Sequence, residues 1–270
     1  MSVSRKGDDC VRRKNGMTVF YFTSTGNSLA VARRIGGKLI SIPQIIDSGN
    51  LNFKDDVIGI VFPVYWITVP EIVRRFMQKA KLEAAYIFAI GTNGGSPGSA
   101  MVDARKLAKK NGYRLDYAVN IIMADNYFPL YDLKKEIDRL PGKKIDEKIS
   151  RIVEDIGKRK HELEGASVVW RFFSALIVRF KKFDNFAKKY TINDQCNKCG
   201  VCKKVCPANN ISVDDKVVFG SRCMGCLACS NLCPQNAIHL KNEKNGQRWR
   251  NPDVSLNEII EANNRGGRQG

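Results

Sequence analysis

The sequence has little histidine, no long apolar run and a shortage of acidic residues. Only two of its 270 residues are histidines, and neither His161 nor His239 stands beside other potential metal ligands or in the setting of a catalytic triad. No apolar run approaches the ~18 residues that a membrane-spanning helix needs. Residues 1–16 are polar and basic and lack the apolar core of a secretory signal, so we expect a disordered tail there. These absences argue against a transmembrane or secreted protein and predict a cytoplasmic one.

The charge of the chain is strongly one-sided. Lysine and arginine total 45 against 27 aspartate and glutamate residues, which gives a formal net charge of +18. Such a charge favours acidic proteins, anionic membranes or nucleic acid as partners. The basic residues are spread along the chain without a helix-turn-helix or RNP-like motif, so we expect no nucleic-acid binding.

The cysteines form two copies of one pattern. Eight of the nine fall in the runs Cys196-x2-Cys199-x2-Cys202-x3-Cys206-Pro207 and Cys223-x2-Cys226-x2-Cys229-x3-Cys233-Pro234. The second run repeats the first with a displacement of 27 residues, from 196 to 223 for the first cysteine. C-x2-C-x2-C-x3-C-P is the run with which bacterial ferredoxins hold [4Fe–4S] clusters, so the repeat predicts a duplicated iron–sulfur unit.

Two other interpretations of the cysteines remain open. A disulfide framework would need an oxidising compartment, and no secretory signal is evident. Two four-cysteine zinc sites are harder to dismiss, but zinc sites usually separate their C-x2-C pairs by a longer run. The spacing therefore favours iron–sulfur clusters.

The segment from Thr191 to Lys241 resembles bacterial two-cluster ferredoxins. The resemblance implies two [4Fe–4S] clusters, each with three ligands from one run and the fourth from the other. The resemblance therefore implies that one cluster is held by Cys196, Cys199, Cys202 and Cys233, and the other by Cys223, Cys226, Cys229 and Cys206. Electron transfer is then the expected activity.

Ahead of the cysteines, short apolar runs alternate with helical stretches. The runs Thr18–Phe22, Val57–Phe62, Ala85–Ile90 and Leu115–Ile122 are rich in β-branched and aromatic residues, as buried parallel strands are. Helical patterns cover residues 70 to about 81, 99 to about 111 and 145 to 162. The alternation predicts an α/β fold with a doubly wound parallel sheet, whose ligands bind at the carboxyl ends of the strands.

Three loops at those carboxyl ends carry the candidate ligand-binding residues. The first is Thr23, Ser24, Thr25, Gly26, Asn27 and Ser28, where hydroxyls and backbone N–H groups at a helix N-terminus could hold a phosphate. It lacks the G-K-[ST] of a P-loop and the G-x-G-x-x-G of a dinucleotide site, and a serine-rich helix cap is the structural alternative. The second and third loops contain Pro63, Tyr65 and Trp66, and Thr92, Asn93, Gly94 and Gly95.

Residues 17 to 164 resemble flavodoxins, whose phosphate loop T/S-x-T-G-x-T/S is matched at every fixed position. The resemblance implies FMN, with the first loop on its phosphate, Tyr65 and Trp66 against its ring, and Asn93, Gly94 and Gly95 near its pyrimidine end. Core aromatics and an ordinary turn are the alternatives for the second and third loops. The segment from Asp125 to Leu140 is longer than a minimal flavodoxin needs, and it could cover a flavin or shape a partner site.

The chain thus divides into a tail (1–16), a flavodoxin-like domain (17–164), a connecting helix (165–190), a two-cluster ferredoxin domain (191–243) and an extension (244–270). From Ser167 to Tyr190 apolar residues recur at steps of three and four, opposed by basic residues. We favour a helix that packs between the domains and buries this stripe over one that contacts an anionic membrane surface.

The fusion as a whole resembles electron-transfer proteins of anaerobes and methanogens. Clusters pass single electrons, whereas a flavin accepts one or two, so the chain could gather electrons singly and release a pair. We expect an electron carrier that works with acidic redox proteins. The alternative is an iron–sulfur flavoprotein reductase that reduces a small molecule at the flavin.

Overall fold

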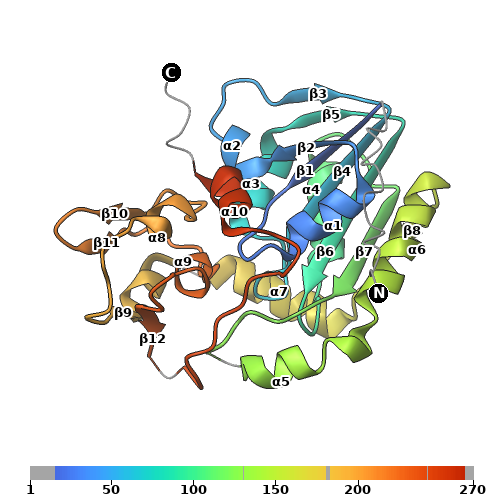
Figure 1. The fold of residues 1–270 in the computed structure, drawn as a ribbon. Helices are drawn as coiled ribbons and strands as arrows, with labels where there is room; N and C mark the ends of the chain where they lie inside the picture. Colours follow the sequence, from blue (N-terminus) through green and yellow to red (C-terminus); the bar gives the residue numbers. More distant parts are fainter. Residues whose placement is uncertain (1–15, 130, 181–182, 242, 265–270) are drawn as a thin grey trace, which may run out of the picture.

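The computed structural model describes residues 16–129, 131–180, 183–241 and 243–264. The tail expected over residues 1–16 lies outside this range except for Gly16, and so does Cys10. Two lobes are visible: a larger one built on a sheet, and a smaller one that contains the cysteine runs (Figure 1).

A six-stranded parallel sheet forms the centre of the larger lobe. In spatial order its strands are β2 (Lys38–Ser41), β1 (Met17–Tyr21), β4 (Val57–Pro63), β6 (Tyr86–Asn93), β7 (Tyr117–Ile122) and β8 (Glu162–Leu163). All neighbouring pairs are parallel. Numbered by their sequence within the sheet, the first five strands stand in the flavodoxin-like order 2-1-3-4-5. The predicted α/β doubly wound fold is confirmed.

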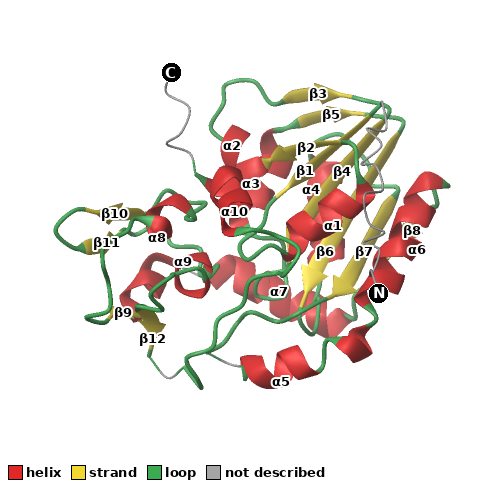
Figure 2. Cartoon of the chain, in the orientation of Figure 1, coloured by secondary structure: helices red, strands yellow, loops and turns green. Residues whose placement is uncertain are grey.

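Helices cover both faces of this sheet, as Figure 2 shows in red. α1 (Asn27–Ile35) and α6 (Ile145–Gly157) pack on one face, whereas α3 (Glu71–Lys79) and α4 (Ala100–Lys110) pack on the other. Every residue of β6 is buried, and β4 is buried except at Pro63. Because both faces of these strands are covered, their sequences are nearly continuous apolar runs rather than alternating ones.

The larger lobe differs from the sequence prediction at its edges. The last helix ends at Gly157 rather than near residue 162, so His161 lies beyond it, ahead of the edge strand β8. The sequence does not predict β2, because this strand has only four residues and they are mostly half-exposed. A short helix, α2 (Ile42–Ile45), and a parallel pair, β3 (Asn52–Lys54) with β5 (Lys81–Glu83), complete the lobe.

The smaller lobe consists of two copies of one backbone unit. Strands β9 (Tyr190–Ile192) and β12 (Ile238–Leu240) pair antiparallel, as do β10 (Ile211–Val213) and β11 (Val217–Phe219). The short helices α8 (Val201–Lys204) and α9 (Ala228–Asn231) begin 27 residues apart, at 201 and 228. The left-handed residues Asn209 (φ 47°) and Asn236 (φ 46°) keep the same offset. The sequence repeat is therefore a structural duplication, and the predicted small ferredoxin domain is confirmed.

Our prediction for the connection between the lobes is wrong on two points. Helix α7 (Val168–Phe180) is followed by a separate 3₁₀ helix, η2 (Phe183–Lys189), so no single helix runs from 167 to 190. The start of α7 is also exposed, since Val169, Phe172 and Phe173 keep 62%, 62% and 51% of their surface accessible. Packing between the domains therefore does not bury this part of the stripe.

After the smaller lobe the chain returns to the larger one. Helix α10 (Leu256–Asn263) begins with a capping box formed by Ser255 and Glu258, and it packs against both α2 and α8. Between β7 and α6 lie α5 (Leu133–Asp138) and the 3₁₀ helix η1 (Pro141–Lys143). No helix within the described residues is both long and apolar enough to cross a membrane.

Candidate functional site

A deep hollow lies where strands β1, β4 and β6 end. Its volume is about 1030 Å³ when the space open to solvent is included. Of the residues predicted to bind flavin, the lining includes Thr23, Ser24, Thr25, Asn27, Ser28, Pro63, Tyr65, Trp66, Thr92, Asn93, Gly94 and Gly95. The remaining one, Gly26, is not part of the lining and packs against Asn251 on the other side of the first loop. The structure thus brings the three predicted loops together.

The first loop has buried hydroxyl groups and leads into helix α1. Thr23 Oγ1 accepts a hydrogen bond from Gly26 N (3.1 Å), and Ser28 Oγ lies 2.8 Å from Thr92 Oγ1. Gly26 has a φ of 104°, a left-handed conformation that glycine adopts without strain. α1 begins at the next residue, and the backbone N–H groups of its first turn could donate to an anion bound in the loop.

The second loop presents aromatic side chains through a strained turn. Trp66 and Ile67 have φ values of 53° and 59°, a conformation that costs about 1–3 kcal/mol for residues with a Cβ. The Trp66 ring stands edge-on to the rings of Tyr127 and Phe186, with centroids 5.2 and 6.2 Å away. The turn places Tyr65 and Trp66 in the wall of the hollow, where they could contact an aromatic ligand.

Gly94 sets the shape of the third loop. A Cβ on Gly94 would lie 2.2 Å from the Cβ of Asp125, so the missing side chain makes room for Asp125 rather than for a ligand. Asn93 donates from Nδ2 to the carbonyl of Gly95, and its buried Oδ1 has no hydrogen-bond partner among the described residues. A buried acceptor without a partner suits a ligand that carries N–H groups, such as the pyrimidine end of a flavin.

Two further groups of lining residues are not among the predicted flavin-binding residues, although the first belongs to the segment that is expected to cover a flavin. Asp125, Asn126, Tyr127 and Tyr131 come from the long segment after β7, whose length is their only sequence signal. Burial is the main cause that raises the pKa of Asp125 above its ordinary value. Gly225, Cys226 and Leu227 come from the smaller lobe. No sequence feature indicates that contact, because it depends on how the two lobes pack.

The eight cysteines surround two small cavities, and each cavity takes cysteines from both runs. One is lined by Cys196, Cys199, Cys202 and Cys233. The other is lined by Cys206, Cys223, Cys226 and Cys229, with Tyr190 beside them. Among the described residues, no three His, Cys, Asp or Glu side chains are grouped as ligands of a single metal ion.

Burial makes several of these thiols, Cys202, Cys226 and Cys229 among them, hard to ionise in the absence of metal. It is the main cause that raises the pKa of Cys202 to about 11, and it raises the pKa values of Cys226 and Cys229 well above the ordinary value. Cysteine binds metal as the thiolate, so filling these cavities with iron would release protons.

The fourth sulfur of each run accepts a backbone hydrogen bond. Asn210 N donates to Cys206 Sγ (3.4 Å), and Ala237 N donates to Cys233 Sγ (3.3 Å). The two donors are again 27 residues apart, at 210 and 237. Hydrogen bonds to sulfur are among the features that set the reduction potential of a cluster. Both copies of the unit have this hydrogen bond at the same place.

Cys226 belongs to both kinds of site. It lines the second cysteine cavity and, with Gly225 and Leu227, the hollow of the three loops. Burial first, and then the charge of a Cys226 thiolate, raise the pKa of Tyr65 in this hollow well above its ordinary value. A cluster in the second cavity would therefore stand directly beside a ligand in the hollow.

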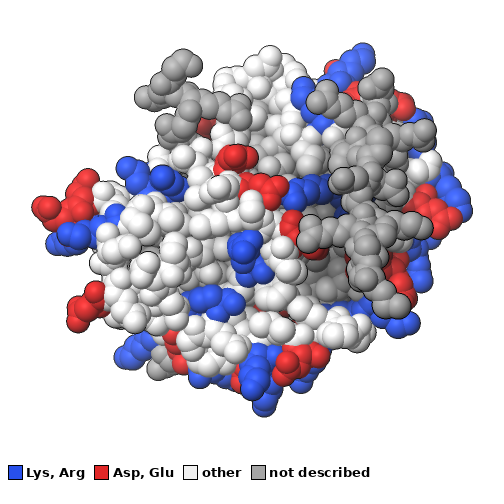
Figure 3. All heavy atoms as spheres, in the orientation of Figure 1, with Lys and Arg blue, Asp and Glu red and all other residues white. Residues whose placement is uncertain are grey.

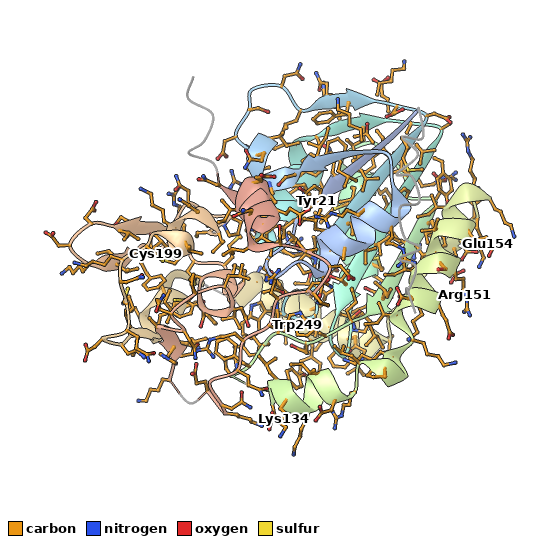
Figure 4. The ribbon with its side chains drawn as sticks, viewed as in Figure 1. Tyr21, Lys134, Arg151, Glu154, Cys199 and Trp249 are labelled. Carbon is orange, nitrogen blue, oxygen red and sulfur yellow. The ribbon has the colours of Figure 1, made fainter. Side chains whose placement is uncertain are left out.

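Residues 249–263, here called the strap, hold the first loop from outside. Asn251 N donates to the carbonyl oxygen of Thr25 (2.8 Å), and Asn251 Nδ2 donates to Asn27 Oδ1 (3.1 Å). Trp249, labelled between the two lobes in Figure 4, donates from Nε1 to the same Asn27 oxygen (3.4 Å). A Cβ on Gly26 would come within 2.9 Å of the Cβ of Asn251. The loop is thus packed between the hollow and the strap.

Asn263, the last residue of α10, joins the strap to both lobes. It is fully buried, and its Nδ2 donates to the carbonyl oxygens of Thr23 (3.0 Å) and of Val205 in the smaller lobe (3.3 Å). One amide therefore links the first loop to the cysteine-rich unit.

Replacing Asn263 with alanine is expected to destabilise the protein. The change leaves two buried carbonyl groups without their donor, which costs about 1–3 kcal/mol and lowers the Tm by several degrees. Thermal unfolding followed by circular dichroism checks this. Gln78→Ala, at an exposed position of α3, is the matched control and should stay within about 0.5 kcal/mol of wild type. Equal Tm values for both variants would contradict the linking role of Asn263.

Comparison with known proteins gives one family match and several structural similarities. Residues 188–234 match the family model of the 4Fe–4S dicluster domain, and no curated protein matches the chain. A candidate flavoprotein from Bacteroides uniformis has 16% identity and a TM-score of 0.31, and the match covers 46% of this chain and 97% of that one. For the Trp repressor binding protein from Bacillus subtilis the values are 12%, 0.32, 50% and 96%. For a short-chain flavodoxin associated with a bacterial microcompartment they are 17%, 0.31, 52% and 98%.

The strand order and the family match together define the class of protein. A parallel sheet of flavodoxin-like order is joined in one chain to a 4Fe–4S dicluster domain. The chain is a fusion of an α/β unit of flavodoxin-like strand order and a ferredoxin-type unit.

Proposed function

We propose that this protein carries electrons between two [4Fe–4S] clusters and one FMN. The observation that supports this best is the position of Cys226, which lines both a four-cysteine cavity and the hollow of the three loops. Clusters exchange single electrons and a flavin exchanges one or two. Electrons could therefore pass between the two kinds of cofactor within one chain.

The residues of the hollow fit the parts of FMN. Thr23, Thr25 and Ser28 are 1%, 2% and 1% exposed, and buried hydroxyls beside the N-terminus of α1 suit a phosphate without help from lysine or arginine. Tyr65 and Trp66 would contact the ring system, and the unpaired Oδ1 of Asn93 would accept a hydrogen bond from its pyrimidine end.

The external redox partners are proposed to be acidic proteins. The formal net charge is +18, and Figure 3 shows lysine and arginine side chains on both lobes. A positive field speeds encounters with acidic carriers, and it weakens as salt screens it.

Replacing both Thr25 and Ser28 with alanine is expected to weaken FMN binding at least about tenfold. Each hydrogen bond to a charged acceptor is worth ~1.5–3 kcal/mol, and ~1.4 kcal/mol is a tenfold change in affinity. The protein would be purified without oxygen, stripped of flavin and titrated with FMN by fluorescence. Iron and sulfide would be assayed on the same samples, which tests for two clusters.

Thr18→Ala/Ser48→Ala is the matched control, because these hydroxyls belong to the same lobe and do not line the hollow. It should bind FMN like wild type, and all three proteins should hold the same amount of iron. FMN affinity that is unchanged in Thr25→Ala/Ser28→Ala, or wild-type protein that binds no FMN, would refute the proposed flavin site.

A further inference from the structure

The first two turns of α7 present an exposed apolar face. Val168, Val169, Phe172 and Phe173 are 77%, 62%, 62% and 51% exposed, and Trp170 is 40% exposed. Residues three and four apart lie on one side of a helix, so the two valines and two phenylalanines form one surface. Soluble proteins rarely leave a group of large apolar side chains in water unless it contacts a partner.

The other side of α7 is fixed to the larger lobe. Ser174, 1% exposed, donates from Oγ to Asp103 Oδ2 (2.8 Å). The same carboxylate oxygen accepts from Thr68 Oγ1 (2.6 Å) and Ser99 Oγ (2.8 Å), which follow the second and third loops of the hollow. The Ser174 bond ties α7 to a carboxylate that the larger lobe itself holds in place, so the opposite, apolar face of the helix is turned to the outside.

Exposed basic side chains lie on α7 and on the 3₁₀ helix that follows it. Arg171 and Arg179 on α7, and Lys188 and Lys189 in η2, are exposed, and the sequence of residues 167–180 contains no acidic residue. Phenylalanine, tryptophan and valine on one side of a helix, with arginine at the border, are typical of helices that lie in the headgroup region of an anionic bilayer. With 13 residues α7 is too short to cross the bilayer.

We propose that α7 docks this protein on an anionic lipid surface. The face of Val168, Val169, Phe172 and Phe173 would enter the boundary between headgroups and acyl chains, and Arg171 would contact lipid phosphates. The net charge of +18 adds long-range attraction to such a surface. This inference is independent of the flavin and cluster assignments, and it makes the protein a peripheral one.

Co-sedimentation of the full chain with vesicles tests the proposal. Wild-type protein, purified with its clusters, should pellet with vesicles of phosphatidylcholine and phosphatidylglycerol. Its partition coefficient should fall at least about tenfold with phosphatidylcholine alone or at high salt. Phe172→Gln/Phe173→Gln should also lose at least about tenfold on the anionic vesicles, because it removes apolar contact without a change of charge.

The matched control is Ile192→Gln/Val218→Gln, which removes two apolar side chains that are 36% and 45% exposed on the smaller lobe. It should bind vesicles like wild type. Iron content and Tm are measured for each variant, and Phe172→Gln alone replaces the double variant if that one does not fold. Wild-type protein that stays in the supernatant would overturn the proposal, as would unchanged binding by the phenylalanine variants. Binding of an acidic protein to this face without vesicle binding would identify a protein partner and overturn it too.

Discussion

Alanine at Cys206 is expected to remove the same cluster as alanine at Cys226, and alanine at Cys233 the same cluster as alanine at Cys199. The reason is geometric: Cys206 lines the cavity that contains Cys226, and Cys233 lines the cavity that contains Cys199. A cluster that loses one of its four thiolates is destabilised while the other keeps its ligands. Each variant should therefore lose about half of the bound iron.

Electron paramagnetic resonance of the reduced variants would sort them into pairs. Alanine is the better substitution, because the oxygen of serine can still bind iron. Cys10→Ala is the control, since Cys10 belongs to neither run, and it should keep both signals. If Cys206→Ala instead shared the spectrum of Cys199→Ala, each run would hold its own cluster, and the crossed arrangement of the cavities would be wrong.

The centre of the fold could be predicted because burial on both faces leaves a strong local signal. β4 and β6 are buried along almost their whole length, and their apolar runs mark them in the sequence. β2 and β8 lie at the edges of the sheet and have only four and two residues. Most of these residues are partly or fully exposed, so no buried apolar run marks the two strands in the sequence. The duplication of the smaller lobe could also be predicted, because the fixed offset of 27 residues is visible in the sequence itself.

The parts of the site that escape prediction are those made by contacts between lobes. Thr23 and its neighbours form a local loop, which the sequence reveals, but Asn251 and Asn263 reach that loop from more than 220 positions away. The place of Cys226 beside the hollow likewise depends on the packing of two units. For α7 the periodicity identifies an apolar side of a helix, but it does not show which side faces the protein, whereas the hydrogen bond from Ser174 to Asp103 does.

Cys199→Ala and Cys226→Ala are expected to differ in how readily the flavin is reduced. Each removes one proposed cluster, but only Cys226, with Gly225 and Leu227, lines the hollow where FMN is proposed to bind. Among the described residues, the cavity of Cys199 contributes none to that hollow. Cys199→Ala should therefore keep rapid exchange between the remaining cluster and the flavin. Cys226→Ala should lose most of it, because the emptied cavity then separates the remaining cluster from the hollow.

Stopped-flow absorbance with a reduced acidic ferredoxin as donor would measure this difference. Both variants should be compared at saturating FMN, since the loop of Cys226 is part of the wall of the hollow and its change could also weaken binding. Equal rates of flavin reduction would mean that the donor reaches the flavin directly and that the Cys226 cavity is not on the route. Faster flavin reduction in Cys226→Ala than in Cys199→Ala would mean that the cluster of Cys199, rather than that of Cys226, exchanges electrons with the flavin. If the two proposed clusters and the flavin form a relay, the flavin loses its electron supply only when the cluster next to it is removed. Because Cys226 lines the hollow, we expect that cluster to be the one held by Cys226.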